Sequence, residues 1–368
     1  MERIILASGG TGGHIFPAMA VAEEIRRRRA GALILFMGGL YGPEGDIAAK
    51  AGLDFVGLPV RGVLGRGGQG FRAAFGLLRG VGKALAIMRK FRPQAVLGFG
   101  GYAAFAGVLA GRLSGRITAI HEQNSLPGMS NRLLGRTARR IFLSMPDVNG
   151  VFPAARTVLV GNPVRADIAA LYERVRPEGD SAARRPRLLV LGGSQGARAL
   201  NRGMLAILPD LLEAGVEIWH QTGQAECEGV RGGYREAGAG RVRVEAFIAD
   251  MARAYAWADL ALCRAGGSSI AELTAAGLPA VLVPFPFAAR DHQRYNARFL
   301  EQEGAGVLLE QERFFGPSGD PGVLARLILE LFRDRAKLAG MGRCGKAAAK
   351  PRAAAQVVDE LEDLLPPS

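Results

Sequence analysis

Short apolar runs alternate with longer amphipathic stretches along the first half of the chain. The runs are residues 3–7, 33–37, 95–99, 117–120 and 141–143. A helical pattern such as residues 17–28 lies between successive runs. A strand that helices cover on both faces has this continuous apolar character. The alternation therefore predicts an α/β fold with a doubly wound parallel sheet.

The same alternation restarts after Gly161-Asn162-Pro163. The apolar runs of the second half are residues 187–191, 216–219, 242–246, 259–263 and 280–283. We therefore expect two Rossmann-like domains, residues 1–163 and residues 164–346, each long enough to bury its own core. The Ala-rich segment 347–368 predicts a terminal helix that ends at Pro366-Pro367. The sequence leaves open whether this helix packs on the first domain or on the second.

A glycine-rich turn follows the first strand of each half. Residues 9–14 read Gly-Gly-Thr-Gly-Gly-His, and residues 192–196 read Gly-Gly-Ser-Gln-Gly. A strand that turns tightly into a helix directs the first N–H groups of that helix at an anion. His14 stands at the mouth of the first turn, where an imidazole can take a proton from a substrate hydroxyl. A structural histidine is the alternative.

Composition limits the class of protein. The formal charge of +13, from 47 basic and 34 acidic residues, favours an anionic partner: nucleic acid, anionic lipid or a phosphorylated substrate. Compositional bias toward arginine is the other explanation. We find no membrane-spanning run and no signal-peptide order, which indicates the cytoplasm. The three cysteines are scattered, so neither a disulfide framework nor a zinc site is indicated.

Two segments of the second half carry polar chemistry. Residues 264–273 lead from a strand into a helix, where Ser268 and Ser269 can reach a diphosphate and Glu272 can accept both hydroxyls of a ribose. Alternatively, the serines cap the helix and Glu272 completes the cap. Residues 291–296 bring amide side chains that suit the hydroxyls of a sugar.

Two common nucleotide motifs are absent. Ile15 stands where a dinucleotide-binding turn requires its third glycine, and the second strand ends in Gly38-Gly39 with no acidic residue for a ribose. Lys83 and Lys346 are each followed by Ala, so neither begins a phosphate-binding P-loop. These observations argue against a nicotinamide-dependent dehydrogenase and a P-loop nucleotidase.

Residues 71–90 mix bulky apolar and basic side chains without an acidic residue. Such a helix can lie on an anionic membrane, with its apolar side down and its basic side among the headgroups. An ordinary core-facing amphipathic helix is the alternative.

Taken together, the segments resemble the MurG family of peptidoglycan glycosyltransferases, which add N-acetylglucosamine to lipid I to make lipid II. The resemblance rests on an ordered set that spans nearly the whole chain. The matching segments are residues 9–17, 98–102, 121–124, 160–165, 192–198 with Asn201, 219–223, 247–251 and 255–296. Each segment is weak alone, but the ordered set is specific.

The resemblance implies the GT-B architecture, two Rossmann-like domains that face a central cleft. It places UDP-N-acetylglucosamine (UDP-GlcNAc) on the C-terminal half and the lipid-linked acceptor against the N-terminal half. The donor residues that it implies are Thr11, Gly12, Gly13, Asn124, Arg165, Ser194, Ile248, Gly267, Ser268, Ser269, Ile270, Ala271, Glu272, Gln293 and Asn296. Among them, Ile248 meets uracil through its backbone, Glu272 holds the ribose, and Gln293 and Asn296 bond the sugar.

The implied reaction converts an α-linked sugar nucleotide into a β-1,4 glycoside, so configuration inverts in one displacement. His14 is our candidate for the base that it requires, and helix N-termini with Arg165 meet the charge of the leaving UDP. No Asp-x-Asp motif occurs, so we expect no obligatory cofactor or Asp-bound metal, and dependence on divalent ions stays open. The chain would be peripheral on the cytoplasmic face of the membrane, and its acceptor and membrane contacts would be Phe75, Leu77, Leu78 and Arg79.

Two departures from the family pattern stand out. Gly267 occupies a position where alanine is expected, which would loosen the diphosphate turn slightly. Residues 43–46, Pro-Glu-Gly-Asp, are an unusual version of the segment after the second strand. Neither departure removes a contact that the resemblance implies.

Two other functions compete with a transferase. A UDP-GlcNAc 2-epimerase shares the paired-domain plan and the donor, but it needs several acids and bases around one sugar. A nucleic-acid-binding protein would use the basic surface, but the chain lacks a nucleic-acid motif, so we expect no nucleic acid as a partner.

Overall fold

A computed structural model of the chain describes residues 1–10, 12–60, 70–174, 184–193, 196–238, 240 and 242–366. The chain divides into two compact units. The first unit is Met1–Arg165 together with Lys350–Ser368, and the second is Ala166–Ala349. The sequence placed this boundary at residue 163, two residues earlier.

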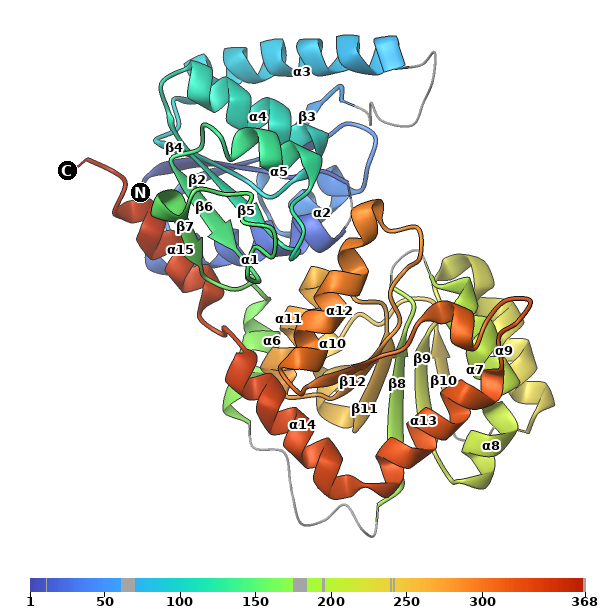
Figure 1. Cartoon of the computed structure of the whole chain (residues 1–368). Helices are drawn as coiled ribbons and strands as arrows, with labels where there is room; N and C mark the ends of the chain where they lie inside the picture. The colour runs from blue at the N-terminus through green and yellow to red at the C-terminus, as the bar shows by residue number, and fades with distance from the viewer. Residues whose placement is uncertain are drawn as a thin grey trace. The chain divides into compact units, whose positions relative to one another are not determined.

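The described residues of the first unit form a seven-stranded sheet in the order β3-β2-β1-β4-β5-β6-β7 (Figure 1). The strands are β1 (Arg3–Ala7), β2 (Leu33–Gly39), β3 (Asp54–Leu58), β4 (Ala95–Gly98), β5 (Ile117–Glu122), β6 (Arg140–Leu143) and β7 (Thr157–Leu159). Every neighbouring pair is parallel; for example, Ile5 of β1 pairs with Leu35 of β2 and Val96 of β4.

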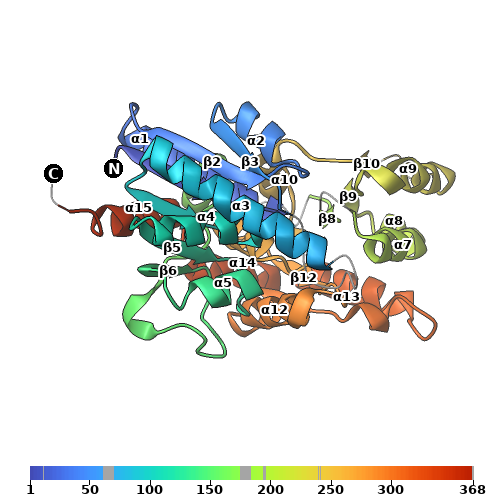
Figure 2. The ribbon, with the colours of Figure 1, turned by 90° about the horizontal axis from the view of Figure 1, so that it is seen from above.

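Helices cover both faces of this sheet. They are α1 (Gly12–Arg28), α2 (Glu44–Lys50), α3 (Gly70–Phe91), α4 (Gly101–Leu113), α5 (Met129–Leu134) and α15 (Ala353–Glu362), with the 3-10 turn η2 (Ala154–Arg156). Successive residues of β1 point to opposite faces: Ile4 packs in the cluster that includes α1 and α15, and Ile5 packs in the cluster that includes α3 and α4. Helices α3 and α4 lie side by side (Figure 2).

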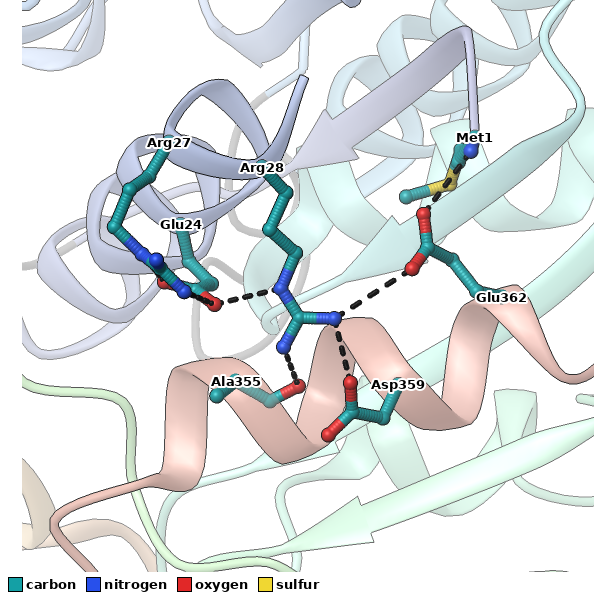
Figure 3. A network of polar contacts seen from close by, with 7 residues as sticks. All are labelled: Met1, Glu24, Arg27, Arg28, Ala355, Asp359 and Glu362. Atoms are coloured by element: carbon teal, nitrogen blue, oxygen red, sulfur yellow. Dashed lines mark hydrogen bonds and ion pairs between the residues drawn. The ribbon is translucent and has the colours of Figure 1, made fainter.

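The C-terminal helix α15 packs on α1, a placement that the sequence left open. The Arg28 guanidinium at the end of α1 reaches Asp359 Oδ1 at 2.5 Å and Glu24 Oε1 at 2.7 Å (Figure 3). The amino group of Met1 donates to Glu362 Oε1 at 3.0 Å. Polar bonds and buried apolar side chains therefore attach the end of the chain to its beginning.

The described residues of the second unit form a six-stranded parallel sheet in the order β10-β9-β8-β11-β12-β13. The strands are β8 (Arg187–Leu191), β9 (Glu217–Gln221), β10 (Val242–Glu245), β11 (Leu260–Cys263), β12 (Ala280–Leu282) and β13 (Gly306–Leu308). The helices are α6 (Ala166–Ala169), α7 (Arg198–Ala206), α8 (Leu208–Glu213), α9 (Cys227–Glu236), α10 (Met251–Trp257), α11 (Gly267–Ala276), α12 (His292–Gln302), α13 (Pro321–Arg333) and α14 (Arg335–Ala348). The 3-10 turns are η3 (Ala170–Glu173), η4 (Gln224–Glu226), η5 (Ala289–Asp291) and η6 (Gln311–Arg313).

The strand order reverses between β1 and β4 in the first unit and between β8 and β11 in the second. Ligands of doubly wound sheets bind beyond the carboxyl ends of the strands at such a reversal. The glycine turns that follow β1 and β8 therefore begin at the expected ligand position of their own unit.

Candidate active site

The turn after β1 packs directly against the turn after β4. Gly9 N donates to Gly100 O at 3.2 Å. A Cβ atom on Gly101, whose φ is +82°, would lie 2.4 Å from Gly9 O. Only glycine permits this close approach of two backbones.

His14 lies half-buried in the first turn of α1. Its Nδ1 is 3.1 Å from Gly9 O. A carbonyl oxygen only accepts hydrogen bonds, so Nδ1 carries the proton and the lone pair of the neutral ring is on Nε2. The backbone therefore selects the tautomer in which Nε2 is the basic nitrogen.

Asn124 is held by the carboxylate at the end of β5. Glu122 Oε1 accepts from Asn124 N at 3.0 Å and from Asn124 Nδ2 at 3.1 Å. Glu122 Oε2 accepts from Asn131 Nδ2 at 2.9 Å. These bonds fix the position of Asn124, which the resemblance placed at the donor.

His121 is fully buried on β5. Its Nε2 is 2.9 Å from Gly161 O, so Nε2 carries the proton, and its Nδ1 accepts from Gln123 Nε2 at 3.0 Å. Burial lowers the pKa of His121 to about 4. The ring is therefore neutral at physiological pH and structural in role.

The remaining predicted contacts of the first unit surround the start of α1. Thr11 lies outside the described residues. Gly12 begins α1, and a Cβ atom there would come within 2.9 Å of the Phe16 ring. Gly13 follows it, half-buried. The guanidinium carbon of Arg165 lies 5.9 Å from the centre of the Phe16 ring.

In the second unit, helix α11 begins at Gly267 without a side-chain cap. Its N-cap residue is Gly266, which has no side chain to cap the helix. Ser268 and Ser269 lie inside the first turn, so the alternative in which they cap the helix is wrong. Because four N–H groups at a helix start lack intrahelical partners, this helix end favours an anion.

The next residues of α11 face two environments. Ile270 is 2% exposed and packs in the core, and Ala271 is half-buried, so Ile270 can meet a ligand only through its backbone. Glu272 lies one turn beyond Ser269, and its Oε2 accepts from the hydroxyl of Tyr255 at 2.7 Å. Tyr255 on α10 is buried, so a rigid partner holds the carboxylate.

The backbone N–H of Ile248, the predicted uracil contact, already donates a hydrogen bond to another residue of the protein. Ile248 N donates to Gln221 Oε1 at 2.9 Å, and both side chains are buried. Sequence reasoning missed this role of Gln221, which ends β9 within the segment 219–223. Its place at a carboxyl strand end was the available signal.

The two predicted sugar contacts also make internal hydrogen bonds. Gln293 Oε1 accepts from Phe285 N at 2.9 Å. Asn296 is fully buried, and its Nδ2 donates to Ala265 O at 3.0 Å. Asn296 thereby ties α12 to the segment before α11, and its direct contact with a sugar stays a prediction.

After β8, Gly196 lies close to a neighbouring backbone, as Gly101 does in the first unit. A Cβ atom on Gly196, whose φ is +77°, would lie 2.6 Å from Thr222 O. Ser194, the predicted diphosphate contact, lies outside the described residues. Behind the turn, His220 Nε2 donates to Asn201 Oδ1 at 3.0 Å. Burial lowers the pKa of His220 to about 3.

Helix α3 presents two bulky apolar side chains to solvent. Phe75 is 57% exposed and Leu78 is 71% exposed, and the Arg79 guanidinium carbon lies 5.9 Å from the Phe75 ring centre. Leu77 packs against the core, so it belongs to the other side of the helix. In the part of the chain that the structure describes, no helix is long and apolar enough to cross a membrane.

No group of three or more His, Cys, Asp or Glu side chains among the described residues could hold a metal ion. Cys227 and Cys263 are buried free thiols, and Cys344 is an exposed one.

Comparison with known families decides the class of this site. The glycosyltransferase family 28 N-terminal domain matches residues 4–143, and the family 28 C-terminal domain matches residues 187–357. The chain belongs to glycosyltransferase family 28. The predicted fold of two Rossmann-like sheets in the GT-B class is confirmed.

Full-length relatives in family 28 share a single description, UDP-N-acetylglucosamine--N-acetylmuramyl-(pentapeptide) pyrophosphoryl-undecaprenol N-acetylglucosamine transferase. The relative from Nitratidesulfovibrio vulgaris Hildenborough is 59% identical over 366 residues, which cover 99% of this chain and 98% of the relative. The relative from Solidesulfovibrio magneticus is 50% identical over 370 residues, which cover 98% of this chain and 97% of the relative.

Solved structures agree with this family 28 assignment. MurG of Acinetobacter baumannii matches with a TM-score of 0.78 and 32% identity, over 99% of this chain and 100% of that one, which confirms the resemblance to the MurG enzymes. A UDP-N-acetylglucosamine 2-epimerase matches with a TM-score of 0.66 and 15% identity, over 98% of this chain and 96% of the epimerase chain. The epimerase shares the fold alone.

Proposed function

We propose that this glycosyltransferase moves N-acetylglucosamine from UDP-GlcNAc to the C4 hydroxyl of the N-acetylmuramyl sugar of lipid I, which yields lipid II for peptidoglycan synthesis. The observation that carries the proposal is the 59% identity over 99% of the chain to a transferase whose name states both this donor and this acceptor.

The donor occupies the second unit. The start of α11, at Gly267, Ser268 and Ser269, binds the diphosphate, because helix N–H groups and the helix dipole favour an anion there. Glu272, held by Tyr255, accepts from the ribose hydroxyls. Ser194 adds a diphosphate contact.

The rest of the nucleotide sugar meets neighbouring loops of the same unit. Ile248 bonds uracil through its backbone. Its N–H already donates to Gln221, so its carbonyl is the group that receives the uracil N3–H. Gln293 bonds the sugar hydroxyls, and Asn296 supports the donor turn through Ala265.

The acceptor meets the first unit, where His14 acts as the general base. Nε2 of His14 takes the proton of the acceptor hydroxyl as that oxygen attacks C1 of the donor sugar. The bond between C1 and the diphosphate oxygen breaks, its electron pair leaves with UDP, and configuration at C1 inverts. The Gly9 carbonyl favours this chemistry because it keeps the proton on Nδ1.

The negative charge on departing UDP is stabilised by the start of α11 and by Arg165. Thr11, Gly12, Gly13 and Asn124 supply further donor contacts from the first unit. Hydrogen bonds from Glu122 fix the Asn124 amide for such a contact.

The enzyme associates with the cytoplasmic face of the membrane, where its lipid-linked acceptor resides. Phe75 and Leu78 enter the interface between headgroups and acyl chains, and Arg79 pairs with anionic headgroups. Helix α3 carries further basic residues and no acidic one, which suits an anionic surface.

Product analysis tests the proposal directly. Incubation with UDP-GlcNAc and a lipid I analogue should give a disaccharide, and NMR should show a β linkage to C4 of the muramyl sugar. Another linkage position or a retained configuration would refute the acceptor assignment or the mechanism. Accumulation of the 2-epimer from UDP-GlcNAc alone would instead favour an epimerase.

A further inference from the structure

One peptide group joins two side chains in the turn after β1. The N–H of Gly10 donates to Glu44 Oε1 at 3.0 Å. The carbonyl of Gly9 accepts from His14 Nδ1 at 3.1 Å. Gly9 C=O and Gly10 N–H are the two ends of one peptide bond. A continuous hydrogen-bonded path therefore runs from the Glu44 carboxylate, through this peptide, to the imidazole.

The protein backbone makes room for the Glu44 side chain. Glu44 begins α2 and is 2% exposed. A Cβ atom on Gly42 would lie 2.0 Å from Glu44 Oε2, and one on Gly38 would lie 2.7 Å from Glu44 Cβ. Two glycines thus leave the space that the side chain fills. The carboxylate makes no ion pair with any described residue, and its Oε2 has no hydrogen-bond partner among them.

The start of α1 is a favourable place for a negative charge. Its N–H groups and dipole attract an anion, and Glu44 supplies a carboxylate to the N–H of Gly10. The glycine turn predicts a site for a phosphate, but the protein's own carboxylate uses this donor. The turn consequently orients a side chain instead of using Gly10 N–H to bind a ligand.

We propose that Glu44 is the positioning residue of the base: it acts on His14 through the Gly9–Gly10 peptide. The carboxylate polarises the peptide, and the more negative carbonyl holds the Nδ1 proton and strengthens Nε2 as a base. The arrangement corresponds to a carboxylate–histidine pair with a peptide between its members. The inference rests on the proposed role of His14.

Other charged or titratable groups face the same end of α1. His121 on β5 interacts electrostatically with His14, but burial lowers the pKa of His121 to about 4, so His121 is neutral at neutral pH. Arg165 lies over the Phe16 ring on the next turn of α1. Both groups are unchanged in a Glu44 variant, so a shift in the pH profile reports on Glu44.

The test replaces Glu44 by Gln, which retains the size and the acceptor but removes the charge. We expect kcat at pH 7.5 to fall about 3- to 10-fold. In a plot of kcat against pH, the acidic limb should shift to lower pH by about half a unit, because loss of a negative charge lowers the pKa of the base. Affinity for UDP-GlcNAc should stay unchanged.

Asp46→Asn is the matched control, since it removes an exposed carboxylate from the same helix. It should leave the profile unchanged. Glu44→Asp keeps the charge, so its acidic limb should lie closer to that of the natural enzyme than the acidic limb of Glu44→Gln does. A Glu44→Gln profile identical to the natural one, or an equal shift in Asp46→Asn, would overturn the proposal.

Histidine NMR separates this inference from the proposed function. The chain has four histidines, so substitution assigns each signal. The His14 titration should shift downward in Glu44→Gln even if another group proves to be the base. An unshifted His14 titration in a folded Glu44→Gln variant refutes the coupling, whereas full turnover in His14→Ala refutes the base assignment.

Discussion

The two units share a strand order, but the side chains that each brings to its strand reversal differ in chemistry. After β1, the Gly9–Gly10 peptide bonds two side chains, Glu44 and His14. After β8, Gly192 N donates to the backbone carbonyl of Gln221 on the neighbouring strand. Ser8 N donates to Met37 O in the same way after β1, so this backbone bond is common to the two turns. In the second unit, the side chain near the strand reversal is Glu272 on α11, which the Tyr255 hydroxyl holds.

This difference shows that a repeated element of a fold need not repeat its chemistry. In both units a helix follows the strand on the other side of the reversal after a glycine, Gly100 before α4 and Gly266 before α11, but only α11 carries the carboxylate Glu272 in the segment that the sequence assigned to the donor. We therefore assign base chemistry to the first unit and most of the donor contacts to the second. The predictions below compare the two units in donor binding, acid stability and membrane binding.

The largest effect on donor affinity is expected at the Glu272 carboxylate. Glu272→Ala should raise the dissociation constant for UDP-GlcNAc about 10- to 100-fold, because hydrogen bonds to a charged group are lost. Tyr255→Phe, which removes only the hydroxyl that holds Glu272, should have a smaller effect of about 3- to 10-fold.

Calorimetric titration measures these affinities, with Glu236→Ala as the control. Glu236 ends α9 and is exposed in the same unit. Unchanged donor affinity in Glu272→Ala would refute the ribose assignment.

Acid should weaken both units through their buried histidines. Burial lowers the pKa of His121 to about 4 and of His220 to about 3, from an ordinary value of 6.5. As the pH falls, these histidines are protonated in the unfolded chain before they are protonated in the folded one. The free energy of unfolding therefore decreases from about pH 6.5 to about pH 4 for His121 in the first unit, and to about pH 3 for His220 in the second.

Between pH 7.5 and 5.5, each histidine should reduce the free energy of unfolding by about 1 kcal/mol. Urea unfolding at the two pH values measures this loss. His121→Gln and His220→Gln should each remove part of the dependence, since glutamine does not titrate. A pH dependence that both variants retain in full would contradict the assignment.

The smallest effect is expected on the exposed face of α3. Phe75→Ser with Leu78→Ser should weaken binding to anionic vesicles about 3- to 10-fold, because two exposed apolar side chains are lost. Vesicle sedimentation measures the binding. Leu40→Ser with Val148→Ser is the control, since both residues are exposed in turns of the same unit. Equal binding by the two double variants would exclude a specific contact of α3.

The sequence predicted those strands whose apolar runs are continuous. It missed β3, β7 and β13. Asp54 and Gly57 interrupt the apolar run of β3, and the other two strands have only three residues each at sheet edges. Short edge strands carry too weak a periodic signal to be distinguished from loops.

The candidate site was predictable where a local pattern defines it. Glycine turns after strands indicated both strand reversals, and residues 264–273 indicated α11. Two hydrogen bonds of the site join residues far apart in the sequence: Glu44 and Gly10 are 34 residues apart, and Gln221 and Ile248 are 27 residues apart. A local sequence pattern cannot predict such bonds. The helix-cap alternative for Ser268 and Ser269 was wrong because Gly266 occupies the cap position.

The division of chemistry between the units is tested most directly by His14→Ala. Single-turnover rates with a lipid I analogue and the dissociation constant for UDP-GlcNAc should be measured on the same preparation. We predict that turnover falls about 10²- to 10⁴-fold, as for loss of a general base, while the dissociation constant changes less than about twofold. Equal losses in turnover and donor affinity, or turnover at the natural rate, would contradict the account.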